Sequence, residues 1–305
     1  MSSSTAGKSY RIAIVGAGAL GLSFAARLVR IVPVAVVARN AAAAERLRAG
    51  IEIAGERVRL DAYGADDLPA AESVIVLVKT GDTEAAARTA LAMRPREVLS
   101  LQNGLVEERL RAALGGAIRA GQGVTTAGAW RDGDRVVPVG VGETLVPAGF
   151  EAVAALLESA GLPARVAPDI RAAQLAKFLV NLALNPVTAI FRVRNGALRD
   201  PPYCRYVDAL VREAWPVLRA EGLALDEAGA QARVAAVIDA TAANRSSMLQ
   251  DVETGRPTEL DALTGAFIAM ASRQRVAVPT HEAVFRLVSL VDGGAPDSGQ
   301  PPAAG

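Results

Sequence analysis

Short apolar runs alternate with stretches of helical spacing in the first half of the chain. Buried strands are predicted at residues 11–15, 34–38, 74–78 and 98–101, with a hairpin over residues 51–60. Strands separated by helical stretches are typical of βαβ units and a parallel sheet. Two further runs, residues 136–139 and 145–146, lie in a glycine-rich region, and we expect them to extend this sheet at its edge.

From residue 151 onward the apolar residues recur at three- and four-residue spacing, which predicts helices. These helices are expected over residues 151–160, 169–184, 203–221, 227–242, 259–274 and 280–291. We place the domain boundary near Pro168, so that residues 11–168 form one domain and residues 169–292 a helical one. Residues 1–10 are interpreted as a flexible leader, and residues 293–305, rich in glycine, proline and alanine, as a disordered tail.

A glycine motif, Gly16-Ala17-Gly18-Ala19-Leu20-Gly21, joins the first predicted strand to a helix. In this context G-x-G-x-x-G is typical of dinucleotide binding. The first glycine allows the tight turn, the second lets a pyrophosphate approach the backbone, and the third permits close packing of helix on strand. The helix N-terminus offers free N–H groups to the phosphates; the alternative is a plain turn that needs positive φ. The predicted fold is therefore α/β, an N-terminal Rossmann-like doubly wound domain followed by an all-α C-terminal domain.

The composition changes this picture mainly by exclusion. Apolar residues make up 51% of the chain but aromatics only 4%, so the core consists mostly of alanine, valine and leucine. The 33 Lys and Arg balance 32 Asp and Glu, which removes the electrostatic argument for nucleic-acid binding.

Cys204 is the only cysteine and His281 the only histidine. No intrachain disulfide can form, which suits a reducing compartment, and the usual zinc site cannot be built, so no metal is expected. We expect His281 to be a surface residue of the last helix. The chemistry then falls to lysine, carboxylates or a cofactor.

The most apolar stretch, residues 178–190, contains Asn181, Asn185 and Pro186 and is short of the about 20 residues that a membrane span needs. The N-terminus lacks the apolar region of a signal peptide. We therefore expect no membrane segment and a cytoplasmic protein.

The residue after the second strand selects the cofactor. NAD sites usually place an acid there for the ribose 2′-hydroxyl, whereas an arginine suits a 2′-phosphate. This chain has Arg39, which favours NADPH/NADP+, although a solvated arginine is the alternative. Lys79 ends a neighbouring strand at the same edge and contacts either the cofactor or only solvent.

Lys177, Asn181 and Asn185 follow one another at intervals of four residues. They lie within an 80° arc of a helix that is apolar on its other faces. A buried polar stripe needs partners, either another helix or a substrate. A substrate site is favoured, because lysine can donate a proton to a developing alkoxide while asparagine orients the substrate.

Two other polar groups have local explanations. Asn244 and Ser247 form a small pair that can equally be a cap at a helix end. Glu259 follows Thr258, and Thr258 with Asp261 makes a capping box that explains the pattern without function.

Taken together, the chain resembles the ketopantoate reductases (2-dehydropantoate 2-reductases) from Arg11 to about Val291. Six motifs in order carry the likeness: the glycine motif, Gln102-Asn103-Gly104, Lys177-x-x-x-Asn181-x-x-x-Asn185-Pro186, Asn195-Gly196, Asn244-Arg-Ser-Ser247-Met-Leu-Gln-Asp251 and Arg256-Pro-Thr-Glu259-Leu-Asp261.

The resemblance implies a role for each motif. The glycine motif cradles the pyrophosphate of NADPH, Arg39 contacts the 2′-phosphate, and Lys79 and Asn103 lie along the cofactor. Lys177 is the general acid, and Glu259 pairs with it and binds the substrate's hydroxyl. The residues that hold the substrate are Asn103, Asn181, Asn185, Asn195, Asn244 and Ser247.

The implied activity is NADPH-dependent reduction of 2-dehydropantoate to (R)-pantoate, on the way to pantothenate and coenzyme A. Thr264-Gly265 stands where the family often has Asn-Gly, and Thr125-Thr126-Ala127-Gly128 lacks the histidine of many members. Paralogous reduction of another 2-oxo acid, a β-hydroxyacid dehydrogenase and a non-catalytic NADPH sensor remain as alternatives. The sequence leaves open whether the chain is a monomer or a homodimer.

Overall fold

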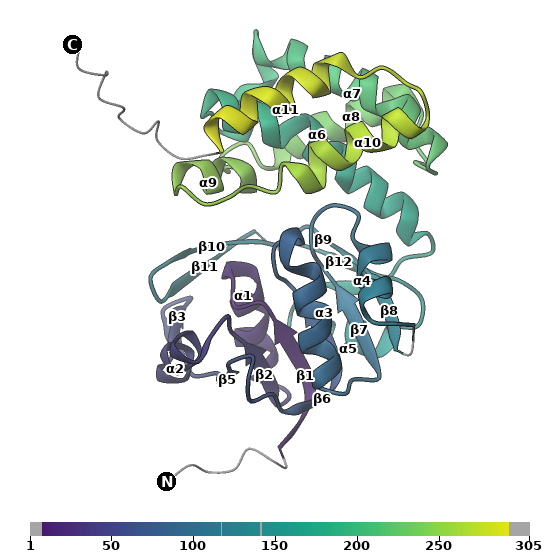
Figure 1. Ribbon diagram of the computed structural model, residues 1–305. Helices are drawn as coiled ribbons and strands as arrows, with labels where there is room; N and C mark the ends of the chain where they lie inside the picture. Colours follow the sequence, from purple (N-terminus) through teal and green to yellow (C-terminus); the bar gives the residue numbers. More distant parts are fainter. Residues whose placement is uncertain (1–7, 117, 141, 293–305) are drawn as a thin grey trace, which may run out of the picture. The chain divides into compact units, whose positions relative to one another are not determined.

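The computed structural model describes residues 8–116, 118–140 and 142–292. The chain divides into two units, Met1–Ile170 (unit 1) and Arg171–Gly305 (unit 2), whose elements are shown in Figure 1. The predicted tail and residues 1–7 of the predicted leader lie outside the described residues. The first strand begins at Ser9, two residues earlier than expected, because Tyr10 is buried in the core of unit 1.

Unit 1 is built on a six-stranded sheet in the order β5-β2-β1-β6-β7-β8. Every neighbouring pair in it is parallel. The strands are β1 (Ser9–Val15), β2 (Val34–Val37), β5 (Asp61–Tyr63), β6 (Ala70–Val76), β7 (Glu97–Ser100) and β8 (Arg119–Gln122). This is the strand order of the dinucleotide-binding Rossmann fold, which confirms the predicted class of the N-terminal half.

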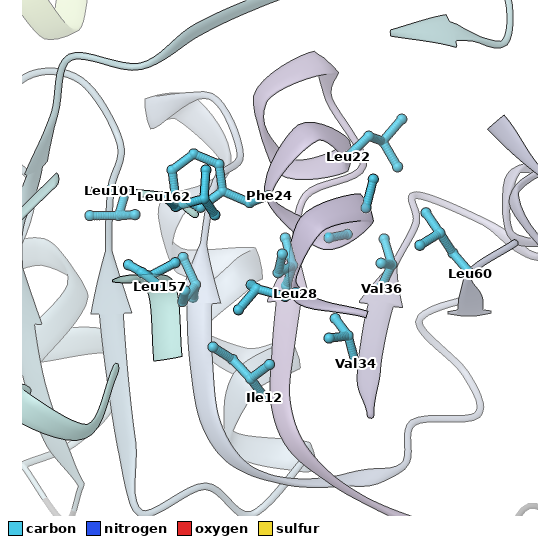
Figure 2. Packing of buried hydrophobic residues seen from close by; sticks show 14 of the residues in the cluster. Ile12, Leu22, Phe24, Leu28, Val34, Val36, Leu60, Leu101, Leu157 and Leu162 are labelled. Carbon is cyan, nitrogen blue, oxygen red and sulfur yellow. The ribbon is translucent and has the colours of Figure 1, made fainter. Parts of the chain in front are cut away.

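Helices cover both faces of the sheet because successive strand side chains point to opposite sides. Ile12 and Ile14 belong to a core cluster formed with α1, α2 and α5, part of which is shown in Figure 2. Ala13 and Val15, one residue along, belong to a second cluster with α3 and α4. The helices are α1 (Ala19–Leu28), α2 (Ala41–Ala49), α3 (Thr83–Ala92), α4 (Glu107–Ala113) and α5 (Glu151–Ser159), with a short 3-10 turn η1 (Thr80–Asp82).

Two small sheets accompany the main one, and here the expected extension of its edge is wrong. The predicted hairpin is confirmed as β3 (Ile51–Ile53) and β4 (Glu56–Val58). The free edge of β3 pairs with β11 (Arg135–Val139), which also pairs with β10 (Gly128–Asp132). Residues 136–139 therefore belong to this second sheet and not to the main one. Residues 144–146 form β12 (Thr144–Val146) between β9 (Val124–Thr125) and β13 (Ala164–Val166).

Unit 2 is helical in the residues that the structure describes. Its helices are α6 (Ile170–Phe191), α7 (Tyr203–Ala220), α8 (Glu227–Ala240), α9 (Ser247–Glu253), α10 (Ala266–Arg273) and α11 (Pro279–Val291), with a 3-10 turn η2 (Asn195–Arg199) and a π-helical segment η3 (Asp261–Gly265). The predicted C-terminal class is confirmed, and α9 is a helix that the periodicity did not predict.

Helix α6 continues past its expected end at residue 184. Pro186 lies inside it, where proline removes a backbone hydrogen bond. Val187 and Ala189 beyond the proline are buried, so apolar packing favours continuation of the helix. By length and composition α6 could cross a membrane, and 72% of its apolar window is buried inside the protein, as in a core helix.

Candidate functional site

The carboxyl ends of four parallel strands bring the predicted cofactor residues to one edge of the sheet. Val15 of β1 is in register with Val37 of β2 and with Val76 of β6, and Val76 is in register with Ser100 of β7. The glycine motif begins one residue after Val15, and Arg39, Lys79 and Asn103 follow the other three ends. Ligands of open α/β sheets bind at this edge.

The three glycines of the motif meet different steric demands. Gly16 has φ +124°, and a Cβ atom there would lie 2.6 Å from the backbone carbonyl of Leu77. A Cβ on Gly21 would lie 2.0 Å from the carbonyl oxygen of Gly16, so α1 packs too closely on the turn for any side chain. A Cβ on Gly18 would meet no atom within 4 Å. The side-chain position at Gly18 is therefore open space that a bound ligand could occupy.

The start of α1 suits an anion. Gly18 is its N-cap and supplies no side-chain hydrogen bond, and the first turn carries no acidic residue. Such an N-terminus presents backbone N–H groups and the positive end of the helix dipole. The residues present therefore fit the pyrophosphate of a dinucleotide.

Two cations lie at the same edge of the sheet. Arg39 is exposed after β2, and Asn40 beside it caps α2 by accepting a hydrogen bond from the N–H of Ala43 at 2.9 Å. Lys79 is exposed after β6, and its carbonyl accepts from the side chain of Gln102 at 3.3 Å. Both positions leave a positive charge where a phosphate group can reach it.

Gln122 is a buried residue at this edge that the sequence did not single out. Its amide nitrogen donates to the carbonyls of Gln102 (3.3 Å) and Gly104 (2.8 Å), on either side of Asn103. Its side-chain oxygen accepts from the N–H of Val106 at 2.9 Å. Gln122 therefore holds the loop that carries Asn103, and no motif marks it because it comes from β8.

Arg131 is a second residue that the sequence did not single out. It lies on β10, and its guanidinium donates to the carbonyl of Ala17 in the glycine motif at 3.3 Å. The two residues are 114 positions apart. Only the return of β10 toward α1 brings this charge to the loop, so no local signal could have revealed it.

In unit 2, α6 carries the predicted polar stripe. Lys177 and Asn181 are partly buried, and Asn185 is only 4% exposed. The residues between them, such as Phe178 and Leu182, are buried in the apolar interior. The stripe is therefore set in a helix that is otherwise packed on nearly every side.

Two opposing effects act on the Lys177 ammonium. Burial lowers its pKa from the usual 10.5 to about 8, because the charged form loses hydration. The negative charge of Glu259 opposes this effect and raises the pKa. The fold thus brings together the two residues that were predicted to form the catalytic pair.

Asn195 and Asn244 are also brought together. The N–H of Asn195 donates to the carbonyl of Asn244 at 3.0 Å, and its side-chain nitrogen donates to Thr241 Oγ1 at 2.9 Å. Asn195 Oδ1 is buried and has no hydrogen-bond partner among the described residues. An unfilled acceptor in a buried asparagine needs an explanation, and a bound donor is one.

The structure does not place Ser247 in a cap at a helix end. α8 ends at Ala240, and α9 begins at Ser247 with Ser246 as its N-cap, accepting from the N–H of Leu249 at 3.1 Å. Ser246 also lies 2.7 Å from the hydroxyl of Thr188 on α6, whereas Ser247 is exposed. The serine that caps a helix here is therefore Ser246, because its hydroxyl accepts from the backbone at the start of α9.

The capping box expected from Thr258 and Asp261 is wrong in its carboxylate, although Thr258 Oγ1 does accept a hydrogen bond from the N–H of Leu260 at 3.3 Å, as an N-cap does. The N–H of Thr258 donates to Asp292 Oδ1 at 2.7 Å, and its hydroxyl donates to Asp292 Oδ2 at 2.7 Å. A carboxylate from the end of α11 thus takes the place that Asp261 would fill. Glu259 follows directly, at the start of the turn that leads into η3.

The expectation that His281 is a surface residue is also wrong. His281 has no exposed surface, packs against Phe267 at 4.3 Å between ring centroids, and contacts Glu213 through Nδ1 at 3.0 Å. Burial lowers its pKa more than Glu213 raises it. The buried face of α11 includes this position because α7 supplies a carboxylate to receive it.

Comparison with known families gives two matches along the chain. A family model described as ketopantoate reductase PanE/ApbA matches residues 12–148, and the model of that family's C-terminal region matches residues 169–292. A 2-dehydropantoate 2-reductase of Archaeoglobus fulgidus is 34% identical over 296 residues, which cover 93% of this chain and 98% of that protein.

Solved structures share the fold. D-mandelate dehydrogenase, in a ternary structure with NADH and anilino(oxo)acetate, has a TM-score of 0.83 at 23% identity over 93% of this chain and 98% of that one. A dimeric ketopantoate reductase from Staphylococcus aureus has a TM-score of 0.79 at 20% identity, over 93% and 99%. The fold of this chain is therefore also found in proteins of quite different sequence.

Proposed function

Because this chain belongs to the ketopantoate reductase family, we infer that it is a 2-dehydropantoate 2-reductase. It is an oxidoreductase that uses a nicotinamide cofactor to reduce the ketone of a small 2-oxo acid, 2-dehydropantoate, to the hydroxyl of (R)-pantoate. This reaction belongs to the synthesis of pantothenate and coenzyme A. The observation that carries the assignment to this site is Lys177, a lysine in an apolar helix under the influence of Glu259.

NADPH is the proposed form of the cofactor. The glycine motif Gly16-Ala17-Gly18-Ala19-Leu20-Gly21 holds the pyrophosphate at the start of α1. Arg39, at the position that distinguishes the two dinucleotides, contacts the 2′-phosphate, and Lys79 and Asn103 lie along the cofactor. The support is the exposure of both cations at the sheet edge and the open space at Gly18.

When bound, the cofactor supplies the hydride that reduces the carbonyl carbon of the substrate. The protein's own part is to supply a proton and to stabilise charge. Lys177 donates the proton from Nζ to the carbonyl oxygen, where negative charge develops, and is left as a neutral amine. Glu259 keeps the ammonium form of Lys177 populated before the transfer, and its carboxylate accepts a hydrogen bond from the substrate's hydroxyl.

The remaining polar residues bind and orient the substrate. Asn181 and Asn185 share the face of α6 that carries Lys177, and Asn195 keeps a side-chain oxygen without a partner among the described residues. Asn244 and Ser247 hold the substrate carboxylate, and the exposed hydroxyl of Ser247 is consistent with ligand contact. Asn103 acts near the nicotinamide end in unit 1.

In this proposal residues 11–168 bind the cofactor and residues 169–292 bind the substrate and donate the proton. The enzyme works in the cytoplasm, and it assembles as a homodimer, as the fold-sharing reductase from Staphylococcus aureus does. Light scattering on the purified protein tests the assembly, because each chain has a mass of 31.5 kDa.

The decisive experiment is NADPH oxidation at 340 nm with 2-dehydropantoate, beside NADH and a panel of other 2-oxo acids. We expect turnover with 2-dehydropantoate and a clear preference for NADPH, which Arg39→Ala should reduce without a comparable loss with NADH. Turnover of another acid alone would replace the substrate and keep the chemistry. Tight NADPH binding with no turnover across the panel would instead identify a sensor.

A further inference from the structure

Asp292 holds the residue that precedes Glu259. Its two carboxylate oxygens each accept a hydrogen bond from Thr258, one from the backbone N–H and one from the hydroxyl, both at 2.7 Å. The two residues are 34 positions apart. A single carboxylate that accepts two short bonds from one residue fixes both the backbone and the χ1 rotamer of that residue.

The stability of α11 alone does not explain this carboxylate. Asp292 is the C-cap of α11, where the helix dipole presents its negative end and disfavours an acidic side chain. The same residue type would be favourable at the opposite end of the helix. A carboxylate at the unfavourable end points to its partner, Thr258, as the reason for its position.

The segment around Glu259 is held on both sides. Upstream, Arg256 contacts Asp251 Oδ1 at 3.3 Å through Nε, and its N–H donates to the Asp251 carbonyl at 2.9 Å. Downstream, Leu260 is buried, and its carbonyl accepts from Gly265 at 3.1 Å in the π-helical turn. π-Helical turns occur frequently at functional sites. Thr258, held by Asp292 (the Asp292–Thr258 clasp), directly precedes Glu259, whose own carbonyl accepts from the N–H of Leu263 at 3.0 Å.

We propose that Asp292 is a positioning residue, which sets through Thr258 the place from which Glu259 acts on Lys177. The proposal rests on the function proposed above, in which Lys177 is the proton donor. Asp292 itself touches neither substrate nor cofactor in this scheme. It acts on the reaction by keeping the negative charge of Glu259 where it stabilises the ammonium form of Lys177.

The chain offers a direct readout, because it contains only three lysines, Lys8, Lys79 and Lys177. Full-length protein labelled with [13Cε]lysine gives three side-chain signals, and that of Lys177 is assigned by its loss in Lys177→Arg. Its titration is followed from pH 6 to 11 without substrate or cofactor. The charged group that acts on Lys177 is Glu259, so Glu259→Gln defines the full effect of losing that charge.

Two variants weaken the clasp in different ways. Asp292→Asn leaves one acceptor oxygen for two donors. Thr258→Val keeps the shape and the backbone N–H but removes the hydroxyl, which also accepts from the N–H of Leu260 at 3.3 Å. In both we expect the titration midpoint of Lys177 to move to lower pH, in the same direction as in Glu259→Gln but less far. We expect kcat at pH 8 to fall about tenfold, since small misplacements at a reacting centre are costly. Thr258→Ser keeps the hydroxyl, so its Lys177 titration midpoint and its kcat at pH 8 should both match those of wild type.

Asp239→Asn is the matched control, because the Asp239 side chain on α8 makes an exposed ion pair with Arg199 of η2 at 3.0 Å. Thermal unfolding shows which variants fold. If Asp292→Asn does not fold, Thr258→Val alone is used for the test. The proposal is overturned if folded Asp292→Asn and Thr258→Val titrate at Lys177 as Asp239→Asn does. A shifted titration in an enzyme that does not reduce 2-dehydropantoate supports the clasp and refutes the assigned reaction.

Discussion

The role proposed for Lys177 as a general acid depends on the surroundings of its ammonium group. Burial lowers its pKa to about 8, and the charge of Glu259 prevents a further fall. A general acid works best when its pKa lies near the operating pH. With a pKa of about 8 the residue is mostly protonated at neutral pH, yet it releases its proton far more readily than an exposed lysine.

This pKa predicts the pH profile of turnover. In the proposed mechanism reduction requires protonated Lys177, so kcat for reduction should fall as the pH rises through about 8, while kcat for oxidation of pantoate should rise over the same range. Initial rates in both directions between pH 6 and 10 measure this. A reduction rate that stays level up to pH 10 would show that Lys177 does not supply the proton.

Removal of the lysine gives a second prediction at the same scale. Lys177→Ala should lower kcat for reduction by about 10²–10³, the usual loss when one electrostatic contact to a developing oxyanion is deleted. The alkaline decline of the profile should disappear with it. Near-wild-type turnover in a folded Lys177→Ala protein would refute the role of the residue.

Among the elements, α1 separates a glycine needed for packing from one proposed to bind the cofactor. Gly21→Ala would place a Cβ atom 2.0 Å from the Gly16 carbonyl, so it should destabilise the fold by at least about 2 kcal/mol through overpacking. Gly18→Ala meets no atom within 4 Å and should leave stability within about 0.5 kcal/mol of wild type. The added methyl group enters the space proposed for the pyrophosphate, so the Kd of Gly18→Ala for NADPH should rise.

Urea unfolding measures the stability of both variants, and fluorescence titration measures their NADPH binding. Unchanged NADPH binding in Gly18→Ala would contradict the proposed site.

The start of α11 depends on a carboxylate from α7. Glu213 accepts hydrogen bonds from the N–H groups of Thr280 (2.8 Å) and His281 (3.1 Å) and contacts His281 Nδ1 at 3.0 Å. Burial would raise the pKa of Glu213, but the bonds from His281 and Thr280 outweigh it and hold the pKa at about 2. Because this pKa lies below the usual 4.5, the stability it supplies is full above pH 4.5 and is lost as the pH falls toward 2.

Glu213→Gln should therefore lower the free energy of unfolding at pH 7 by about 2 kcal/mol, the usual worth of hydrogen bonds to a charged group. The variant should also lose less stability than wild type between pH 4.5 and 3. Urea unfolding at several pH values measures both effects. The exposed Glu282, paired with Arg286 at 3.7 Å, provides the control Glu282→Gln, which should change little.

At the scale of the whole molecule, the residues proposed to bind the cofactor and to donate the proton belong to different units of the chain. The glycine motif belongs to unit 1, and Lys177 and Glu259 belong to unit 2. A ligand at 100 times its Kd stabilises the folded state by about 2.7 kcal/mol. NADPH at 100 times the wild-type Kd should raise the Tm of Lys177→Ala as much as that of wild type. The same concentration should raise the Tm of Gly18→Ala less. Loss of the NADPH-induced shift in Lys177→Ala would show that the lysine contributes to cofactor binding.

Much of this molecule could be predicted from local patterns. The glycine motif, the alternation of strands and helices, and the polar stripe of Lys177, Asn181 and Asn185 depend on residues within a few positions of one another. Chain periodicity reports such relations directly, because side chains repeat every two residues in a strand and every 3.6 in a helix. The Rossmann order followed from the same patterns, since parallel connections allow few topologies.

The remaining features depend on residues far apart in the chain. The carboxylate that binds Thr258 is Asp292, 34 positions away, and not the nearby Asp261. The buried His281 contacts Glu213, which lies 68 positions away. The pairing of β11 with β3 and the bracing of Asn103 by Gln122 likewise come from segments that meet only in the fold. Local spacing determines which side chains share a face, because the backbone geometry is regular. The partner that a buried polar group finds on that face, and hence its pKa, is settled by packing between distant segments.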